Sequence, residues 1–437
     1  MRRLLVSLVA IFAVLLLAGF AVWLFGADQL DRRLNRVAAD PAAPVPSAAD
    51  LAFHRDLFVA DLHADTLKWE RDLLTRSAVG HVDLPRLVDG NVGLQLFTIV
   101  TKSPIPRSHP EIPGERCVSG SGINVAGLLA FAQGRPAWSL RERAIWQVRR
   151  LYDAAERSRE RPGPELRVIT DAEGLRRLLA DWRAGKQVVG GILGIEGGHW
   201  IGAEDDPSAA GPTVAERVRA DMRQLFDLGV RMFAPTHRFD NALSGSSEGC
   251  EAYGLTPQGR IALQAAEELG MAVDLSHISP KGFRDALEML TAPAVVSHTG
   301  LQRGCEAPCR PARNLSDEEL RLLIENGGVV GVGYWPQALG PTVLRIADVM
   351  AHVMDLAREL GREPGRHVAF GSDYDGSVTP FFDASQVAIL TTILRRYGPP
   401  FDAGTIRAIA GLNTCRLFAQ RLPGGGADKA DEFCTAE

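Results

Sequence analysis

Seven polar residues lie at the ends of apolar runs in this chain, and their side chains are of the types that bind metal ions or transfer protons. They are His63, Asp65, Glu196, His237, His277, His298 and Asp373. A strand that is buried on both faces consists largely of consecutive Val, Ile and Leu, so the runs are typical of parallel strands in an α/β protein. Active sites of barrel proteins of this class lie at the C-terminal ends of the strands, so these residues are candidates for one site.

His63 and Asp65 end the run VADLHAD. Residues i and i+2 of a strand point to the same side, so both side chains can face one ion at the end of a barrel strand. The alternative is a hydrogen-bonded turn that leads into a helix. Glu196 ends the Gly-rich run GILGIE, where an unpartnered carboxylate is costly to bury. Its two oxygens can bridge two cations; the alternative is an ion pair with an arginine or with His199 of the same EGGH sequence.

His277 and His298 end two consecutive runs, AVDLSH and AVVSH. Neutral imidazole is a common ligand of zinc-like ions, although a single histidine of this kind is explained equally well as a hydrogen-bonded core residue. Together with the H-x-D pair and a buried glutamate, the two histidines favour a site for two metal ions. His63 and Asp65 would bind one ion, the two histidines the other, and Glu196 both. Such a pair of ions holds a water or hydroxide that attacks an acyl carbon.

Hydrolysis of an amide also requires a group that transfers protons and a group that stabilises the oxyanion. Asp373, in the sequence GSDYDG, is the candidate general base and acid. Asp375 of the same motif is the alternative for that role, or caps a turn. His237 ends the fourth apolar run and is the candidate for the oxyanion, with a fifth metal ligand or a structural hydrogen bond as its alternatives.

The apolar runs predict the elements that position these side chains. Eight runs occur, at 58–63, 94–100, 188–196, 231–236, 271–276, 292–297, 328–335 and 367–373. Helical stretches separate most of them, and the patterns Thr170-x-x-Glu173 and Ser316-x-x-Glu319 predict capping boxes at two helix starts. Alternating strands and helices favour a (β/α)8 TIM-type barrel over a doubly wound open sheet.

The N-terminus contains an uncharged apolar stretch of 23 residues, Leu4 to Gly26. About 20 such residues span a hydrocarbon core, so we expect an uncleaved transmembrane helix, with a cleavable signal segment as the alternative. Residues 1–26 would form the anchor and 27–50, rich in Pro and Ala, an extended linker. The catalytic domain would occupy 51–424, and 425–437 would form a mobile tail.

Net charge and cysteine content indicate which partners and which cellular compartment to expect. The chain has 437 residues with a net charge of −5 and no basic stripe with interleaved aromatic residues, so we expect no nucleic-acid partner. Its six cysteines favour disulfides and an exported domain over zinc binding or free thiols. Cys305 and Cys309 are the pair most easily bridged.

Nine motifs follow one another in an order that adds a family resemblance. They are DLHADT, HVDLPRL(x)5GLQLF, IEGGH, THRFDN, VDLSH, VVSHTG, ARNLSDEEL, GGVVGV and GSDYDG. In this order they resemble the membrane (renal-type) dipeptidase family of zinc peptidases, within the amidohydrolase-like barrels, over about Leu51 to Leu422. The chain departs from the animal members of that family in having an N-terminal apolar segment in place of a C-terminal lipid-anchor signal. Its cysteines also fall at different places.

The resemblance implies roles that agree with the strand-end argument. His63 and Asp65 match the ligands of one zinc ion, and Glu196 matches the bridging carboxylate. The ligands of the second zinc ion are matched by His277 and His298. His237 matches a residue that contacts substrate and transition state, and Asp373 matches the aspartate that transfers the proton. Arg313 matches an arginine that pairs with the C-terminal carboxylate of the dipeptide. From its position alone, Arg313 is equally explained as a surface arginine before the Ser316 helix cap.

We therefore expect a membrane-anchored dipeptidase with two Zn²⁺ per chain, although the same ligands accept other divalent transition metals. A hydroxide that bridges the ions would cleave dipeptides, including those with a C-terminal D-residue, as the resemblance implies. The expected partners are dipeptides and the membrane, and the resemblance adds a homodimer. The catalytic domain would lie in the periplasm or outside the cell. The competing hypotheses are an amidohydrolase that acts on another small amide, lactone or β-lactam, and a binding protein that keeps the fold.

Overall fold

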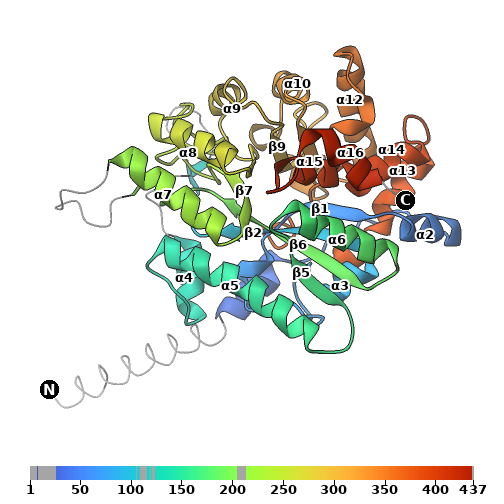
Figure 1. Ribbon diagram of the computed structural model, residues 1–437, viewed down its shortest axis with the longest axis horizontal. Coiled ribbons are helices and arrows are strands. Elements are labelled where there is room, and N and C mark those ends of the chain that lie inside the picture. The colour runs from blue at the N-terminus through green and yellow to red at the C-terminus, as the bar shows by residue number, and fades with distance from the viewer. Residues whose placement is uncertain are drawn as a thin grey trace.

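A sheet of parallel strands forms the centre of the computed structural model, which describes residues 7, 26–104, 106–108, 116–118, 120, 124–203 and 213–435 (Figure 1). Eight strands are ordered β8-β7-β6-β2-β1-β11-β10-β9, and β5 (Glu165–Val168) pairs with the N-terminal half of β6. A bridge between Asp274, just after β8, and Val295 of β9 joins the two ends of this order. The eight strands are β1 (Val59–Ala64), β2 (Val92–Val100), β6 (Val188–Glu196), β7 (Val230–Ala234), β8 (Ala272–Val273), β9 (Val295–Thr299), β10 (Val329–Val332) and β11 (Val368–Phe370). Each overlaps one predicted run, so the prediction of a parallel α/β architecture of the TIM type is confirmed.

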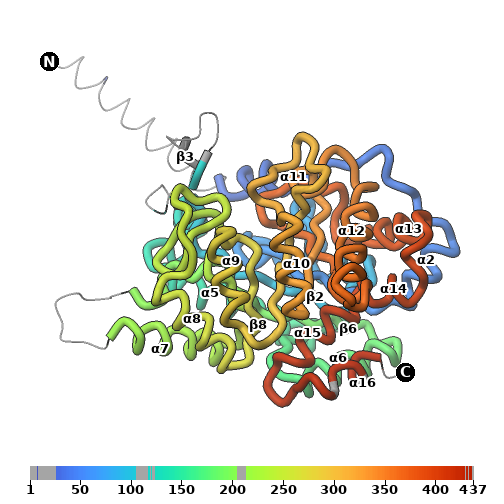
Figure 2. The backbone as a smooth tube through the Cα atoms, turned by 90° about the horizontal axis from the view of Figure 1, so that it is seen from above, coloured from blue at the N-terminus to red at the C-terminus, as the bar shows by residue number. Residues whose placement is uncertain are grey.

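Helices connect these strands and cover the outside of the sheet (Figures 1 and 2). A short antiparallel hairpin, β3 (Pro106–Ser108) with β4 (Arg116–Val118), lies outside it. The helices are α2 (Ala48–Arg55), α3 (Leu84–Asp89), α4 (Val125–Ala132), α5 (Leu140–Arg159), α6 (Ala172–Arg183), α7 (Val214–Asp227), α8 (Pro257–Glu268), α9 (Pro280–Leu287), α10 (Asp317–Glu325), α11 (Pro336–Leu339), α12 (Arg345–Glu359), α13 (Ala388–Tyr397), α14 (Ala403–Arg407), α15 (Asn413–Arg421) and α16 (Ala427–Thr435).

Capping side chains set where two of these helices begin. Ser316 forms the predicted capping box at the start of α10. Helix α6 is capped by Asp171, whose side chain accepts a hydrogen bond from the backbone N–H of Gly174, rather than by Thr170. A carboxylate is as good a cap as a hydroxyl, and Asp171 stands one position nearer to the helix.

Two glycines allow the C-terminal ends of three strands to approach one another. A Cβ atom added to Gly331 of β10 would lie 2.1 Å from the carbonyl oxygen of Ser297 in β9, and one added to Gly371, just after β11, would lie 2.0 Å from the same oxygen. Ser297 immediately precedes His298, so this close approach fixes the strand end that carries a predicted ligand.

The segment before the barrel differs from the predicted extended linker. The predicted anchor at 1–26 falls almost entirely outside the described residues, and among the residues that are described no helix is long and apolar enough to cross a membrane. Residues 26–34 are helical, and α2 begins at Ala48. Between the two helices, Asp40 accepts hydrogen bonds from the Thr342 hydroxyl and the backbone N–H of Val343. Within the range predicted as a linker, the structure thus has one helix at 26–34 and polar side-chain contacts to the barrel.

The C-terminal segment is packed as well, where we predicted a mobile tail. Cys434 of α16 forms a disulfide with Cys415 of α15, and α16 lies beside α6 (Figure 2). The other disulfides are Cys117–Cys250 and Cys305–Cys309, so all six cysteines are paired. The cysteine content alone indicated disulfides but did not indicate that one of them fastens this segment.

A substitution tests the close approach at Gly331. We expect Gly331→Ala to lower the free energy of unfolding by about 1–3 kcal/mol, the usual range for overpacking, because backbone atoms cannot move aside as a flexible side chain can. The matched control is Gly404→Ala in α14, where an added Cβ would meet only the Asp402 carboxylate at an ordinary 3.5 Å. Urea unfolding of both variants measures the difference, and equal stability of the two would contradict the tight packing at Ser297.

Candidate metal centre

All five predicted metal ligands converge at the C-terminal ends of the strands. His63 and His298 belong to β1 and β9, Glu196 is the last residue of β6, and Asp65 and His277 follow β1 and β8. Each of them is at most 5% exposed. Five polar side chains at one point of an apolar barrel are costly to bury without partners.

Glu196 lies at the centre of this group. Its Oε1 atom is 3.0 Å from Nε2 of His277, 3.5 Å from Nε2 of His298 and 3.6 Å from Nε2 of His63. Nε2 of His63 is in turn 3.4 Å from Oδ1 of Asp65. Among the described residues, three groups have potential ligand atoms within 4.8 Å of one another. One of them joins His63, His298 and Asp373, and the other two share Glu196, namely His63–Asp65–Glu196 and Glu196–His277–His298. These are the two sets that the sequence predicted.

The charges of the group fit positive ions. Nε2 of His63 and Oε1 of Glu196 are buried without a hydrogen-bond partner. Although burial disfavours its charge, Glu196 and Asp65 raise the pKa of His63 to about 9. Burial alone would raise the pKa of Glu196, but the imidazole rings around it, His63 among them, hold it well below its usual range. The site therefore attracts positive charge and keeps its carboxylate ionised, as a site for divalent cations requires.

One serine hydroxyl orients a histidine of each group. The Ser297 hydroxyl donates to Oδ2 of Asp274 at 2.6 Å, which leaves its lone pairs to accept from Nδ1–H of His63 at 3.0 Å and Nδ1–H of His298 at 2.9 Å. We assign the ring protons to Nδ1 on this ground. In the neutral form of both rings the lone pair then lies on Nε2 and faces the centre, which is the tautomer a metal ligand needs; a bound cation would replace the proton that the raised pKa places on Nε2 of His63.

The sequence analysis missed two aspartates that support this arrangement. Asp274 also accepts from the Ser276 hydroxyl at 2.6 Å, and Asp61 accepts from the backbone N–H of His63 at 3.0 Å and from the Ser372 hydroxyl at 2.9 Å. Both aspartates are buried. A signal was present, because each interrupts an apolar run two or three residues before a predicted ligand, in VADLH and AVDLSH.

Polar groups of β2 and of two loops also contact individual ligands. Lys68 lies 2.9 Å from Oδ2 of Asp65, and the Thr98 hydroxyl donates to Oδ1 of the same carboxylate at 2.6 Å. Oε2 of Glu248 lies 3.5 Å from Nδ1 of His277. Glu248 lies in the loop between β7 and α8, and no pattern in the sequence marked it as a residue of the site.

Asp373 lies at the edge of the group of ligands, whereas Asp375 lies outside it. Oδ1 of Asp373 is 3.9 Å from Nε2 of His63, and its side chain keeps 13% exposure, while that of His63 has none. Burial, together with the carboxylates of Asp65 and Glu196, raises the pKa of Asp373 to about 7. The Asp375 carboxylate instead binds Arg71, outside the group.

His237 also faces the group. Its Nε2 atom lies 3.3 Å from Oε2 of Glu196, and its Nδ1 atom lies 3.4 Å from the carbonyl oxygen of Lys102. Burial lowers the pKa of His237 to about 4, so the ring is neutral at pH 7 and carries one proton, which either donates from Nδ1 to the carbonyl oxygen of Lys102 or faces Glu196 from Nε2. His199, the alternative partner of Glu196, stacks on Phe239 instead.

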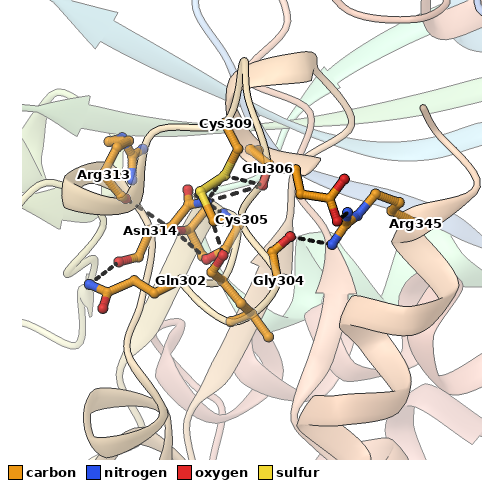
Figure 3. The surroundings of a disulfide bond; sticks show 12 residues. Gln302, Gly304, Cys305, Glu306, Cys309, Arg313, Asn314 and Arg345 are labelled. Atoms are coloured by element: carbon orange, nitrogen blue, oxygen red, sulfur yellow. Dashed lines mark hydrogen bonds and ion pairs between the residues drawn. A yellow bond between two sulfur atoms is a disulfide. The ribbon is translucent and has the colours of Figure 1, made fainter. Parts of the chain in front are cut away.

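Arg313 reaches the group from the loop after β9. Its Nη2 atom donates to the carbonyl oxygen of His298 at 2.9 Å and lies 3.3 Å from Nε2 of His277. Figure 3 shows that the Cys305–Cys309 disulfide and Asn314 lie beside it. The Asn314 amide donates to Sγ of Cys309 at 3.0 Å and to the carbonyl oxygen of Leu301 at 3.2 Å, so the loop that carries Arg313 is held in one shape.

Two curated proteins illustrate what the chain resembles in sequence. Over 353 residues it is 26% identical to dipeptidase tcpJ of Claviceps purpurea, with 79% of this chain and 70% of that protein covered. Over 301 residues it is 33% identical to an uncharacterised dipeptidase, C3A11.10c, of Schizosaccharomyces pombe, with 68% of this chain and 62% of that protein covered.

Solved structures show a similar fold. A dipeptidase described as a metallopeptidase of family M19 aligns with a TM-score of 0.60 at 24% identity, over 84% of this chain and 99% of the other. A metallopeptidase from Rhodobacter sphaeroides, solved with a phosphinate mimic of the dipeptide L-Ala-D-Ala, aligns with a TM-score of 0.59 at 23% identity over the same shares.

The family itself follows from a match to a family model. Residues 49–422 match the model of the membrane dipeptidases, peptidase family M19. This range contains every predicted ligand and the three predicted substrate residues. The chain therefore belongs to peptidase family M19 and is a metal-dependent dipeptidase.

Proposed function

We propose that this dipeptidase works with two zinc ions that share the carboxylate of Glu196. The observation that carries the proposal is that Oε1 of Glu196 lies within 3.6 Å of three imidazole Nε2 atoms from three different strand ends. His63 and Asp65 would hold one ion, and His277 and His298 the other. Nitrogen and oxygen ligands of this kind suit zinc, which supports hydrolysis without redox chemistry.

When bound, the two ions would supply the nucleophile, a hydroxide held between them, and positive charge for the developing oxyanion. The residues of the chain do the rest. The neutral ring of His237 faces the group from the side of Glu196, and with its proton on Nε2 it can donate to the oxyanion. The Asp373 carboxylate is close enough to accept a proton and pass it to the leaving amine.

Arg313 would set the length of the substrate. A guanidinium group pairs with a carboxylate through two parallel hydrogen bonds, and Arg313 reaches the group next to His277. A dipeptide whose scissile carbonyl lies at the metal centre has its C-terminal carboxylate only one residue away, within reach of this side chain. A tripeptide would place its carboxylate beyond it.

We further propose that dipeptides with a C-terminal D-residue are substrates. The similar fold of the Rhodobacter sphaeroides metallopeptidase, which was solved with a mimic of L-Ala-D-Ala, supports this part of the proposal. The apolar stretch Leu4 to Gly26 supports a membrane anchor, and the three disulfides support a catalytic domain in the periplasm or outside the cell.

Metal removal tests the two-ion proposal on the full-length chain in detergent. We expect chelation to abolish hydrolysis of L-Ala-L-Ala and L-Ala-D-Ala, and zinc to restore it, while Ala tripeptides stay intact throughout. Metal analysis should give two zinc ions per wild-type chain and fewer in Glu196→Gln, which keeps the size of the side chain but loses its charge. Two retained ions in Glu196→Gln would refute the shared carboxylate. Bound metal without dipeptide cleavage would favour another amide, lactone or β-lactam as substrate.

Removing the carboxylate of Asp373 separates proton transfer from metal binding. We expect Asp373→Asn to keep the wild-type zinc content and KM but to lower kcat by about 100-fold to 10,000-fold, the usual contribution of general acid–base catalysis. Steady-state kinetics and metal analysis of the same preparation measure both. Loss of zinc together with activity would instead identify Asp373 as a metal ligand.

The role of Arg313 is tested with substrates that lack the carboxylate. We expect Arg313→Gln to lower kcat/KM for dipeptides by about 10-fold to 100-fold, because a hydrogen bond to a charged group contributes about 1.5–3 kcal/mol. Hydrolysis of the corresponding dipeptide amides should be unchanged. Arg303→Gln on the same loop, with a side chain that is 68% exposed, is the matched control. An equal loss for dipeptides and their amides would contradict carboxylate recognition.

A further inference from the structure

The loop that carries Asp373 has an unusual backbone. Asp373, Asp375 and Ser377 all have positive φ angles, of 56°, 60° and 64°. Residues with side chains rarely adopt this conformation, and they keep it only where surrounding contacts hold it. What holds this loop therefore determines where the Asp373 carboxylate lies.

Asp375 makes most of these contacts. Its carboxylate accepts hydrogen bonds from the Thr66 hydroxyl at 2.8 Å and the backbone N–H of His81 at 2.8 Å, and it pairs with Nη2 of Arg71 at 2.7 Å. Its carbonyl oxygen accepts from the Trp69 indole N–H at 2.7 Å. The side chain is fully buried, so these bonds are not exchanged for water.

Arg71 is in turn held by a residue outside the barrel. Its Nε atom lies 3.0 Å from Oδ2 of Asp31, in the helix at 26–34. The side chains of Arg71 and Asp31 are each 8% exposed. Although burial disfavours the charge of Arg71, Asp375 and Asp31 together raise its pKa. The guanidinium group thus bridges two carboxylates, one in the N-terminal helix and one in the loop of Asp373.

Two further contacts connect the same segment to the same loop. Asn35 binds Asp31 through its Nδ2 atom at 2.7 Å, and its Oδ1 atom accepts from the backbone N–H of Ser377 at 3.2 Å. The carbonyl oxygen of Arg36 lies 3.3 Å from Nε2 of His81, whose Nδ1 atom accepts from the backbone N–H of Asp375 at 2.9 Å. Because Nδ1 is the acceptor, Nε2 carries the proton and donates to Arg36.

The burial pattern of the segment shows that these contacts are its specific attachment. Between residues 26 and 36, the buried residues are Asp31 and Asn35, both polar, while the apolar residues Leu30 and Leu34 are only half-buried. A cavity of about 280 Å³ lies beside this contact and is lined by Asp28, Asp31 and Arg32 of the helix and by Trp69 and Arg71. Apolar packing alone does not account for this docking.

We propose that the segment 26–36, which precedes the family match at 49–422, is a working part of the active site: through Asp31, Arg71 and Asp375 it positions the proton-transfer residue Asp373. Asp31 touches neither substrate nor metal and acts as a positioning residue. The proposal rests on the proposed role of Asp373, but the contacts from Asp31 to the loop do not depend on it.

The experiment compares two aspartates of one helix in the full-length, zinc-loaded chain. Asp31→Asn removes the charge that faces Arg71, whereas Asp28→Asn removes a charge that pairs with the exposed Arg32 at the surface. We expect Asp31→Asn to lower kcat at least tenfold, since misplacing a catalytic group by about 1 Å can cost about 100-fold. KM and zinc content should stay as in the wild type, and Asp31→Glu should recover part of the loss. Asp28→Asn should match the wild type.

Hydrogen exchange provides a second readout that is independent of activity. Peptides that cover residues 372–378 should exchange at least tenfold faster in Asp31→Asn than in Asp28→Asn or the wild type. If Asp31→Asn does not fold, Asn35→Ala takes its place in both measurements. This substitution removes the contact to Ser377 and leaves Arg71 paired. Unchanged exchange at 372–378 would overturn the proposal, as would a lower melting temperature with kcat intact. If the wild type cleaves no dipeptide, the proposed function fails, and hydrogen exchange still decides whether the segment orders the loop.

Discussion

The buried carboxylate of Glu196 is the constraint on which the rest of the site depends. Its side chain is 2% exposed, and the carboxylates of Asp65 and Asp373 lie close to the same point. Three acidic groups in a dry barrel cannot all stay ionised unless positive charge offsets the cost of burying them. The protein supplies Lys68 to Asp65 and, beyond that, mostly imidazole rings. Divalent cations bound beside Glu196 would supply the missing charge, so the donor set fits metal ions better than a network of hydrogen bonds.

Buried polar groups at the ends of the strands hold this donor set in position. The Ser297 hydroxyl connects Asp274, His63 and His298, and so joins residues of three strand ends around the barrel. The close approach of Gly331 and Gly371 to the Ser297 carbonyl fixes the same residue from the other side. Since a ligand must be placed to within a fraction of an ångström, the ring tautomers and the backbone position have to be fixed together.

Local sequence was sufficient to predict the strands and the ligand types. Buried parallel strands differ from their surroundings by composition alone, and a His, Asp or Glu at the end of such a run is conspicuous. The same reasoning placed Ser316 as the cap of α10. It misplaced the cap of α6 by one residue and treated 27–50 and 425–437 as linker and tail, because Pro, Ala and Gly content describes an isolated segment and not the surface on which it docks.

The positioning contacts could not be predicted because they join residues that are far apart in the chain and ordinary in their own neighbourhoods. Asp31 follows Leu30 in a short charged helix, and Arg71 precedes Asp72 in a loop; only the fold brings both to Asp375. The consequence concerns more than stability. Helix 26–34 directly follows the apolar stretch Leu4 to Gly26, so the same short stretch of chain that would leave a membrane also holds the loop of Asp373. A segment that precedes the family match thus reaches the loop of Asp373 through the buried ion pair of Asp31 with Arg71.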